Sequence, residues 1–113
     1  MGRDRMMIWG ARFDALYGLV DLMEAAWRGM SDLTGPTAYF YGAHDEIIPR
    51  RAALSAAGRL RPSARTAYYE RGWHLLLRDL QAETVWRDAA AFIRDPAGPW
   101  PSEAPSIPGP GLA

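Results

Sequence analysis

The chain is one domain at most, because it has 113 residues, 49% of them hydrophobic, with 13 arginines balancing 13 acidic residues. It contains no cysteine, lysine or asparagine, which excludes disulfide frameworks, thiolate nucleophiles, Schiff-base lysines and the phosphate-binding P-loop. The zero net charge argues against nucleic acid as a partner, and no apolar run approaches the roughly 20 residues of a membrane span. We therefore expect a cytoplasmic protein without a transmembrane segment.

The first half of the chain predicts a helix, a strand and a second helix. Apolar residues at helical spacing predict a helix over residues 13–27, with Gly29 as its C-cap. An aromatic, β-prone run at residues 37–41 predicts a largely buried strand. After a loop, Pro49 begins a short helix that Pro62 ends.

The second half adds a strand, a helix and a tail. Residues 65–69 predict a strand, and the segment from Leu75 or Gln81 to Arg94 predicts a helix. Strands joined by a helical crossover normally lie parallel in one sheet, but two such strands leave edges and apolar faces uncovered. Residues 96–113 are rich in proline and poor in large apolar groups, so we expect a disordered tail. The predicted fold class is α/β with an incomplete sheet.

The residues that could carry chemistry follow the two strands. Asp45 lies in a Gly-Ala-His-Asp stretch after the first strand, and His74 in a Gly-Trp-His stretch after the second. Because parallel strands end at the same edge of a sheet, this carboxylate and this imidazole can approach within hydrogen-bond distance. The aspartate would then fix the tautomer of the ring and stabilise the imidazolium. Asp45 and His74 are the candidate catalytic residues.

These stretches resemble a known family, the α/β-hydrolases, and within it the lysophospholipase and monoacylglycerol-lipase-like serine hydrolases. Residues 36–49, PTAYFYGAHDEIIP, are similar to the strand, loop and proline that carry the family's catalytic acid. Residues 69–79, YERGWHLLLRD, are similar to the loop that carries its catalytic histidine. The resemblance covers most of residues 4–95 and corresponds to the C-terminal part of the fold.

The resemblance implies a serine hydrolase in which Asp45 is the acid and His74 the base. Its substrate, in the complete enzyme, would be a lipid-like carboxylic ester, with no metal or organic cofactor. Residues 1–12 would be the end of a helical cap, and residues 13–95 the C-terminal part of the hydrolase domain.

The family's nucleophile has no counterpart in the chain. Its Gly-x-Ser-x-Gly elbow should precede the acid, and the nearest stretch, Gly-Met-Ser-Asp-Leu around Ser31, has Leu33 as its last residue and follows a helix. Ser31 is better explained as a helix-terminus serine. The glycine-rich oxyanion-hole loop is also absent. We therefore expect a C-terminal hydrolase fragment that is inactive alone; the alternative is a non-catalytic binding module whose sheet a partner chain completes.

Simpler roles compete with catalysis at each position. Asp45 also fits an N-cap of the helix that begins near Pro49, and His74 a packed histidine beside Trp73. His44 is expected to be a loop residue that points away from Asp45 if the strand alternation continues. A zinc site of His44, Asp45 and His74 lacks the ligand spacing of known motifs. The motif context favours the catalytic pair over these alternatives.

Overall fold

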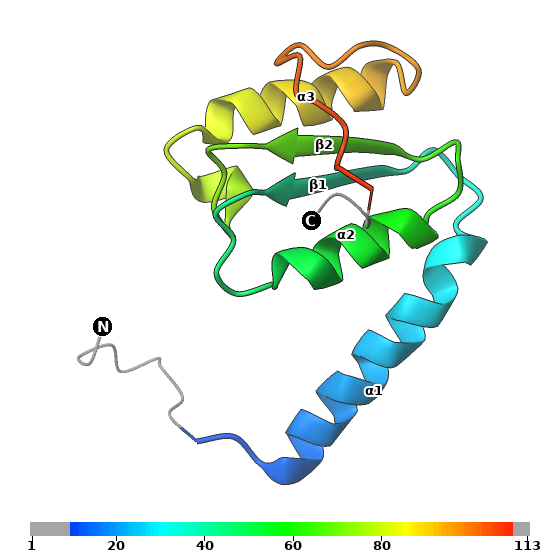
Figure 1. The fold of residues 1–113 in the computed structure, drawn as a ribbon, viewed down its shortest axis with the longest axis vertical. Helices are drawn as coiled ribbons and strands as arrows, with labels where there is room; N and C mark the ends of the chain where they lie inside the picture. The colour runs from blue at the N-terminus through cyan, green and yellow to red at the C-terminus, as the bar shows by residue number, and fades with distance from the viewer. Residues whose placement is uncertain (1–9, 110–113) are drawn as a thin grey trace.

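The computed structural model describes residues 10–109, in which three α-helices alternate with two strands (Figure 1). The predicted order of helix, strand, helix, strand, helix is confirmed. The bounds are α1 Phe13–Gly29, β1 Ala38–Gly42, α2 Arg50–Arg59, β2 Arg65–Tyr69 and α3 Ala82–Arg94. Two short 3-10 turns lie between them, at Met30–Asp32 and Leu76–Arg78. The last helix therefore begins at Ala82 and not at Leu75.

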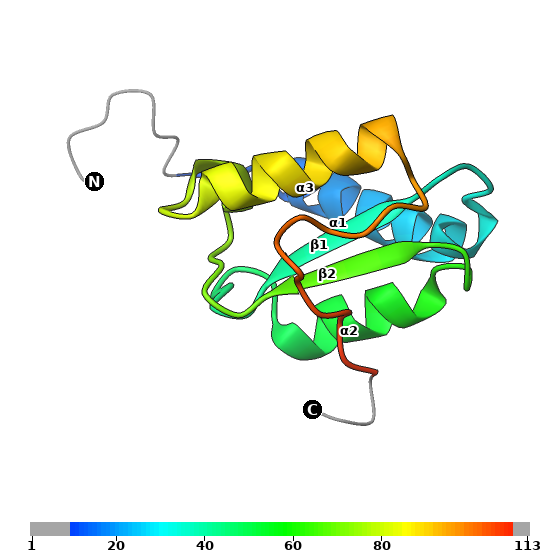
Figure 2. The ribbon, with the colours of Figure 1, turned by 90° about the horizontal axis from the view of Figure 1, so that it is seen from above.

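The two strands pair in parallel. Ala38 lies opposite Arg65 and Gly42 opposite Tyr69, so both strands end on the same side of the molecule (Figure 1). Figure 2 shows α2 on one face of the sheet and α3 on the other. Helices on both faces are usual for parallel strands, whose two faces are both apolar. This arrangement brings the loops that follow β1 and β2 to one edge of the sheet.

The core is divided between the two faces of the sheet. One cluster of buried side chains packs between the strands and α2, and the other between the strands and α3. The first consists of Tyr41, Ala53, Leu54 and Ile107, and the second of Ala67, Tyr69, Val85 and Trp100. Each cluster thus includes a side chain from the segment beyond α3.

The expectation of a disordered tail is wrong for residues 96–109. Trp100 and Ile107 are each only 9% exposed. The Trp100 indole N–H donates to the Thr66 carbonyl at 3.2 Å, and the guanidinium of Arg65 lies 3.9 Å from the centroid of the Trp100 ring. Average composition missed this segment because its order comes from two large side chains with specific partners. The proline-rich segment is part of the fold.

The same segment covers the outer edge of β2. Backbone groups of Thr66 and Tyr68 point away from β1, as alternate positions of a paired strand do. The Tyr68 N–H donates to the Pro105 carbonyl at 2.8 Å, and the Thr66 hydroxyl oxygen accepts from the Ile107 N–H at 2.9 Å. The first contact satisfies a backbone edge group that would otherwise be open to another strand, and the second fastens the segment to β2 through a side chain.

A buried carboxylate holds the segment against α3. Asp88 is fully buried, and its Oδ2 accepts from the Tyr69 hydroxyl at 2.8 Å. Its Oδ1 accepts from the backbone N–H of Ser102 at 3.0 Å, and the Ser102 hydroxyl donates to Oδ2. A buried carboxylate is tolerated only with such partners. Burial, together with the bond to Asp88, raises the pKa of the Tyr69 phenol.

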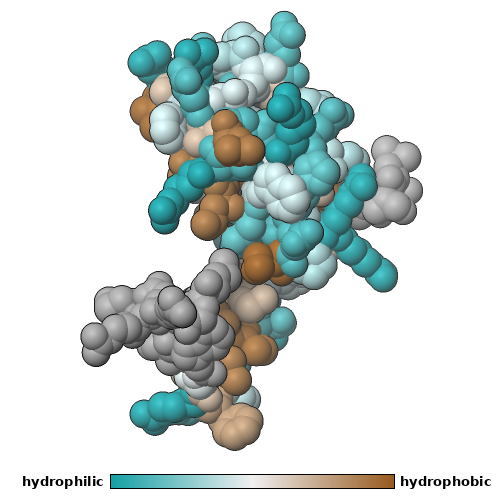
Figure 3. All heavy atoms as spheres, turned by 90° about the vertical axis from the view of Figure 1, so that its left-hand side faces the viewer, coloured by the Kyte–Doolittle hydropathy of each residue, from teal (hydrophilic) through white to brown (hydrophobic). Residues whose placement is uncertain are grey.

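Helix α1 projects from the body formed by the other elements (Figure 1). None of its residues is buried. Its C-terminal end is tied to α2, where the Arg59 Nε donates to the Trp27 carbonyl at 2.9 Å. Figure 3 shows brown side chains along the lower part of the molecule, where α1 runs. The large apolar side chains exposed on α1 are Phe13, Leu16, Tyr17, Leu19, Val20, Leu22 and Met23.

No helix within residues 10–109 has the length and apolar character needed to cross a membrane. The expected end of a cap falls mostly on residues 1–9, and the end of the expected tail on residues 110–113. Both stretches lie outside the described residues.

Candidate active site

Two loops meet at the carboxyl edge of the sheet, the acid loop (residues 43–49) after β1 and the histidine loop (residues 70–75) after β2. The Ala43 N–H donates to the Tyr69 carbonyl at 2.9 Å, and the His44 N–H to the Gly72 carbonyl at 2.9 Å. The backbone pairing of the strands therefore continues into the loops. Backbone hydrogen bonds alone therefore hold the two loops side by side.

Asp45 and His74 come together where the sequence predicted that they would. The Nδ1 of His74 lies 3.0 Å from Oδ2 and 3.1 Å from Oδ1 of Asp45. Because an ionised carboxylate only accepts hydrogen bonds, Nδ1 is the ring nitrogen that carries the proton. The Asp45 side chain is 7% exposed and that of His74 41% exposed. Their catalytic roles stay a prediction, but their geometry is that of an oriented imidazole.

Asp45 is held as an anion by its own loop. Its Oδ1 accepts from the backbone N–H groups of Ile47 and Ile48, each at 2.8 Å. Burial by itself raises the pKa of Asp45, but the hydrogen bonds from the Ile48 amide, His74 and the Ile47 amide outweigh it. The pKa of Asp45 therefore lies below its ordinary value of 3.8.

The alternative in which Asp45 caps helix α2 is wrong. The N-cap position of α2 is Pro49, and no side chain caps it. The bonds from Asp45 to Ile47 and Ile48 close a tight turn inside the acid loop instead. Asp45 thus shapes the loop that presents it to His74.

Two further residues support the site, and the sequence analysis did not predict their roles. Asp79 Oδ2 accepts from the Trp73 backbone N–H at 2.8 Å, which fixes the histidine loop next to His74. The Tyr41 hydroxyl donates to the Ile48 carbonyl at 3.0 Å, which braces the acid loop from the end of β1. Asp79 ends the stretch that resembles the histidine loop of hydrolases, but nothing in its spacing indicated the bond to Trp73.

His44 lies in the acid loop, as expected, and contacts Trp73. Its ring stacks on that of Trp73, with centroids 5.1 Å apart and planes inclined by 26°. Within residues 10–109, no three histidine, aspartate or glutamate side chains gather in a group that could hold a metal ion.

An open groove of about 300 Å³ adjoins His74. It combines exposed apolar side chains with two carboxylates. Its lining residues are Glu46, Ile47, Trp73, His74, Leu75 and Asp79.

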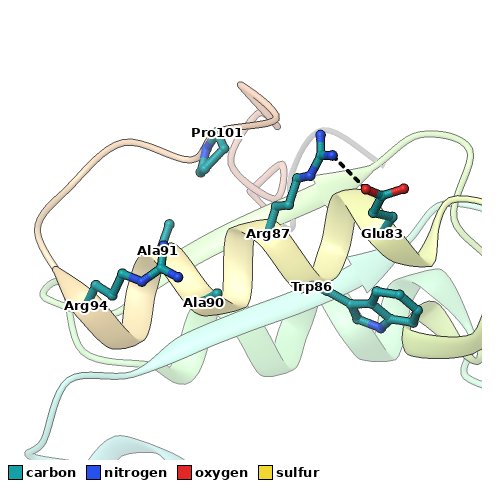
Figure 4. Close-up of a pocket in the computed structure, with 7 residues that line it drawn as sticks. All are labelled: Glu83, Trp86, Arg87, Ala90, Ala91, Arg94 and Pro101. Carbon is teal, nitrogen blue, oxygen red and sulfur yellow. Dashed lines mark hydrogen bonds and ion pairs between the residues drawn. The ribbon is translucent and has the colours of Figure 1, made fainter.

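A second cavity, of about 370 Å³, lies on α3 and is shown in Figure 4. Its lining includes the ion pair between Arg87 and Glu83, at 2.6 Å. The remaining lining residues are Trp86, Ala90, Ala91, Arg94 and Pro101. Although it is larger, none of its lining residues comes from the acid loop or the histidine loop, so the groove beside His74 is the candidate site.

Ser31 lies in the 3-10 turn Met30–Asp32, directly after α1. Its carbonyl accepts from the Nε of Arg61 at 3.0 Å. Figure 1 shows α1 meeting the body at the end of the strands opposite to the acid and histidine loops. This position gives Ser31 no access to His74.

The sequence profile of the family described as "Serine aminopeptidase, S33" matches residues 1–81, which include Asp45 and His74 and end just before α3. The chain belongs to this α/β-hydrolase family. No curated protein and no solved structure matches it. Within the S33 hydrolase fold, β1 and β2 carry the two candidate loops, and the packed residues 96–109 lie beyond the matched region.

Proposed function

We propose that Asp45 and His74 are the acid and base of a serine hydrolase that cleaves carboxylic esters of lipid-like alcohols. The observation that carries the proposal is the contact between the Asp45 carboxylate and the Nδ1 of His74. This contact directs the proton of the neutral imidazole to Nδ1, so Nε2 is the nitrogen that can accept a proton from a nucleophile. The membership of an α/β-hydrolase family supports the same reaction class.

The reaction needs a serine that these 113 residues do not supply on a Gly-x-Ser-x-Gly elbow. The hydroxyl oxygen of that serine attacks the ester carbonyl carbon while Nε2 of His74 takes the hydroxyl proton. Asp45 stabilises the imidazolium, which then protonates the departing alkoxide and leaves an acyl-serine. A water molecule, deprotonated by the same nitrogen, then attacks the acyl carbon. The bond from that carbon to the serine oxygen breaks, the imidazolium returns its proton to the serine oxygen, and the carboxylic acid is released. Without the serine, the pair has nothing to activate.

The groove beside His74 supports an apolar substrate. Ile47 and Leu75 are 66% and 59% exposed, and Trp73 adds an exposed aromatic ring next to them. Burying such side chains against an acyl chain is favourable, at about 25 cal/mol for each Å² removed from water. A peptide substrate would gain less from this wall, because its backbone needs hydrogen-bonding partners.

The test restores the missing nucleophile. The full chain is mixed with an N-terminal segment of an S33 hydrolase that carries the Gly-x-Ser-x-Gly elbow, and fatty acid release from monoacylglycerol and lysophosphatidylcholine is measured. We expect hydrolysis only on mixing, and a loss of about 10³-fold or more in the His74→Ala variant. The Glu83→Gln variant is the control, because Glu83 is exposed on α3 and belongs to neither loop.

No hydrolysis on mixing would reject the proposed reaction, and two further results would count against parts of the proposal. Equal activity of the His74→Ala mixture would remove His74 from the reaction. Cleavage of an aminoacyl anilide without cleavage of either lipid ester would keep the triad chemistry but exclude the lipid-like substrate.

A second candidate is a non-catalytic module whose sheet another subunit completes. The observation that favours it is the pairing of β1, which within residues 10–109 has β2 as its only strand neighbour. The exposed apolar face of α1 adds surface that a subunit could cover. Such a module forms a defined oligomer of its own in solution and shows no ester hydrolysis on mixing, whereas a hydrolase fragment associates with the segment that carries the missing serine.

A further inference from the structure

The end of β1 and the acid loop contact the histidine loop at three successive points. Gly42 lies against Gly72, the His44 ring stacks on Trp73, and Asp45 bonds to His74. The contacts thus run in the same order along both chain segments, from the end of β1 into the acid loop on one side and along Gly72, Trp73 and His74 on the other. The catalytic contact is the last of these pairs, and the His44–Trp73 stack immediately precedes it.

Trp73 is held at both its backbone and its ring. Its N–H donates to Asp79 at 2.8 Å, and its ring lies at a centroid distance of 5.1 Å from that of His44. This distance and the small angle between the planes fall within the range of stacked aromatic pairs. His44 is itself fixed, because its N–H donates to the Gly72 carbonyl at 2.9 Å. The ring of Trp73 is therefore positioned from the acid loop, and its backbone by Asp79.

His74 has few other constraints on its orientation. It lies in an irregular stretch between β2 and the turn Leu76–Arg78, and its side chain is 41% exposed. Within residues 10–109, the hydrogen bonds of its side chain both go to Asp45. The backbone of His74 follows directly from Trp73. A shift of Trp73 would therefore move the His74 ring, and the contact with Asp45 would be the main interaction that opposes this movement.

We propose that His44 is a positioning residue, which by stacking on Trp73 keeps Nδ1 of His74 on the Asp45 carboxylate. The proposal rests on the proposed function for its catalytic meaning, since a fixed Nδ1–H leaves Nε2 to act as the base. The contribution of His44 is the flat face of its ring. A phenylalanine keeps that face and an alanine removes it.

The test exploits the histidine content of the chain. His44 and His74 are its two histidines, so in the His44→Phe and His44→Ala variants every imidazole signal comes from His74. The tautomer of His74 is measured in both full-length variants by ¹H–¹⁵N correlation spectra at alkaline pH, where imidazoles are neutral. The double variant His44→Phe/Asp45→Ala gives the spectrum of His74 without its carboxylate partner.

We expect His44→Phe to hold His74 in the Nδ1–H form. His44→Ala should shift it toward the Nε2–H form of a free imidazole, by at least half of the change that the Asp45→Ala double variant produces. Finding the same tautomer of His74 in His44→Phe and His44→Ala would overturn the proposal. Loss of the Nδ1–H form in both variants would also overturn it. If His44→Ala does not fold, Trp73→Ala against Trp73→Phe, both combined with His44→Phe, tests the same stack from the other loop.

The outcome is independent of the hydrolytic assay. A tautomer that depends on the stack, combined with no ester hydrolysis on mixing, would reject the proposed reaction and keep the role of His44 in orienting His74. Hydrolysis on mixing, combined with a tautomer that does not depend on the stack, would keep the proposed reaction and reject the role of His44.

Discussion

Gly42 and Gly72 approach so closely that neither position has room for a side chain. A Cβ on Gly42 would lie 2.5 Å from both the carbonyl carbon and the carbonyl oxygen of Gly72. A Cβ on Gly72 would lie 2.6 Å from Cδ2 of Leu76 and 3.0 Å from Cα of Gly42. The two glycines thus set the separation of the loops that carry Asp45 and His74.

Gly42→Ala should destabilise the fold more than Gly72→Ala. The first clashes with backbone atoms that cannot move independently, while the closest atom to the second is the end of a flexible side chain. We expect a loss of about 2 kcal/mol in the free energy of unfolding for Gly42→Ala, measured by urea denaturation. Gly35→Ala is the matched control, because a Cβ there meets nothing within 4 Å. Equal losses at Gly35 and Gly42 would contradict the close contact.

The stability contributed by Asp45 should depend on pH. Its folded-state pKa lies below its ordinary value of 3.8, so the ionised form stabilises the fold. That contribution is complete above the unfolded-state pKa and is lost as the pH falls through the lower folded-state pKa. Asp45→Asn should therefore cost about 1.5 kcal/mol at neutral pH and progressively less below about pH 4. Unfolding curves of both proteins across this range check it; a constant difference would be the contrary result.

Removing the Asp88 carboxylate should release residues 96–109. Asp88→Ala leaves the Tyr69 hydroxyl and Ser102 without their acceptor in a buried site, which should cost about 3 kcal/mol. Amide hydrogen exchange should accelerate at Ile107, whose N–H donates to Thr66. Glu83→Gln is the control, since an exposed ion pair on the same helix contributes about 0.5 kcal/mol or less. Unchanged protection of Ile107 in Asp88→Ala would show that the carboxylate does not hold the segment.

The two tryptophans near α3 should respond unequally to truncation. Trp100 is 9% exposed and packs against Arg65 and Phe40, whereas Trp86 on α3 is 54% exposed. Trp100→Ala should cost about 3 kcal/mol or more and Trp86→Ala about 1 kcal/mol, measured by urea denaturation followed by far-ultraviolet circular dichroism. Similar losses for the two variants would mean that Trp100 is not part of the core.

Local signals in the sequence were sufficient for the regular elements. The strand at residues 65–69 was predicted to its observed bounds, because Pro62 and Gly72 interrupt the pattern on either side. The proximity of Asp45 and His74 also followed from topology alone, since parallel strands deliver their loops to one edge. Neither inference needed the orientation of any side chain.

The sequence did not predict the parts that depend on individual contacts in irregular backbone. The bond from Trp73 to Asp79 and the stack of Trp73 on His44 join residues with no periodic relationship. The packing of Trp100 and Ile107 depends on partners more than 30 residues earlier in the chain. A prediction from average composition gives no weight to such individual residues. It therefore predicted disorder for residues 96–109, which are packed against the sheet.

The segment at residues 96–109 also limits how copies of this chain can polymerise. Growth of an ordered fibre through strand pairing needs two open edges on every unit, one to receive a strand and one to offer the next. Pro105 and Ile107 occupy one of those edges by bonding to Tyr68 and Thr66. Pairing through β1 alone therefore stops after two copies have joined. A fibre held by strand pairing can grow only after residues 96–109 have dissociated from β2.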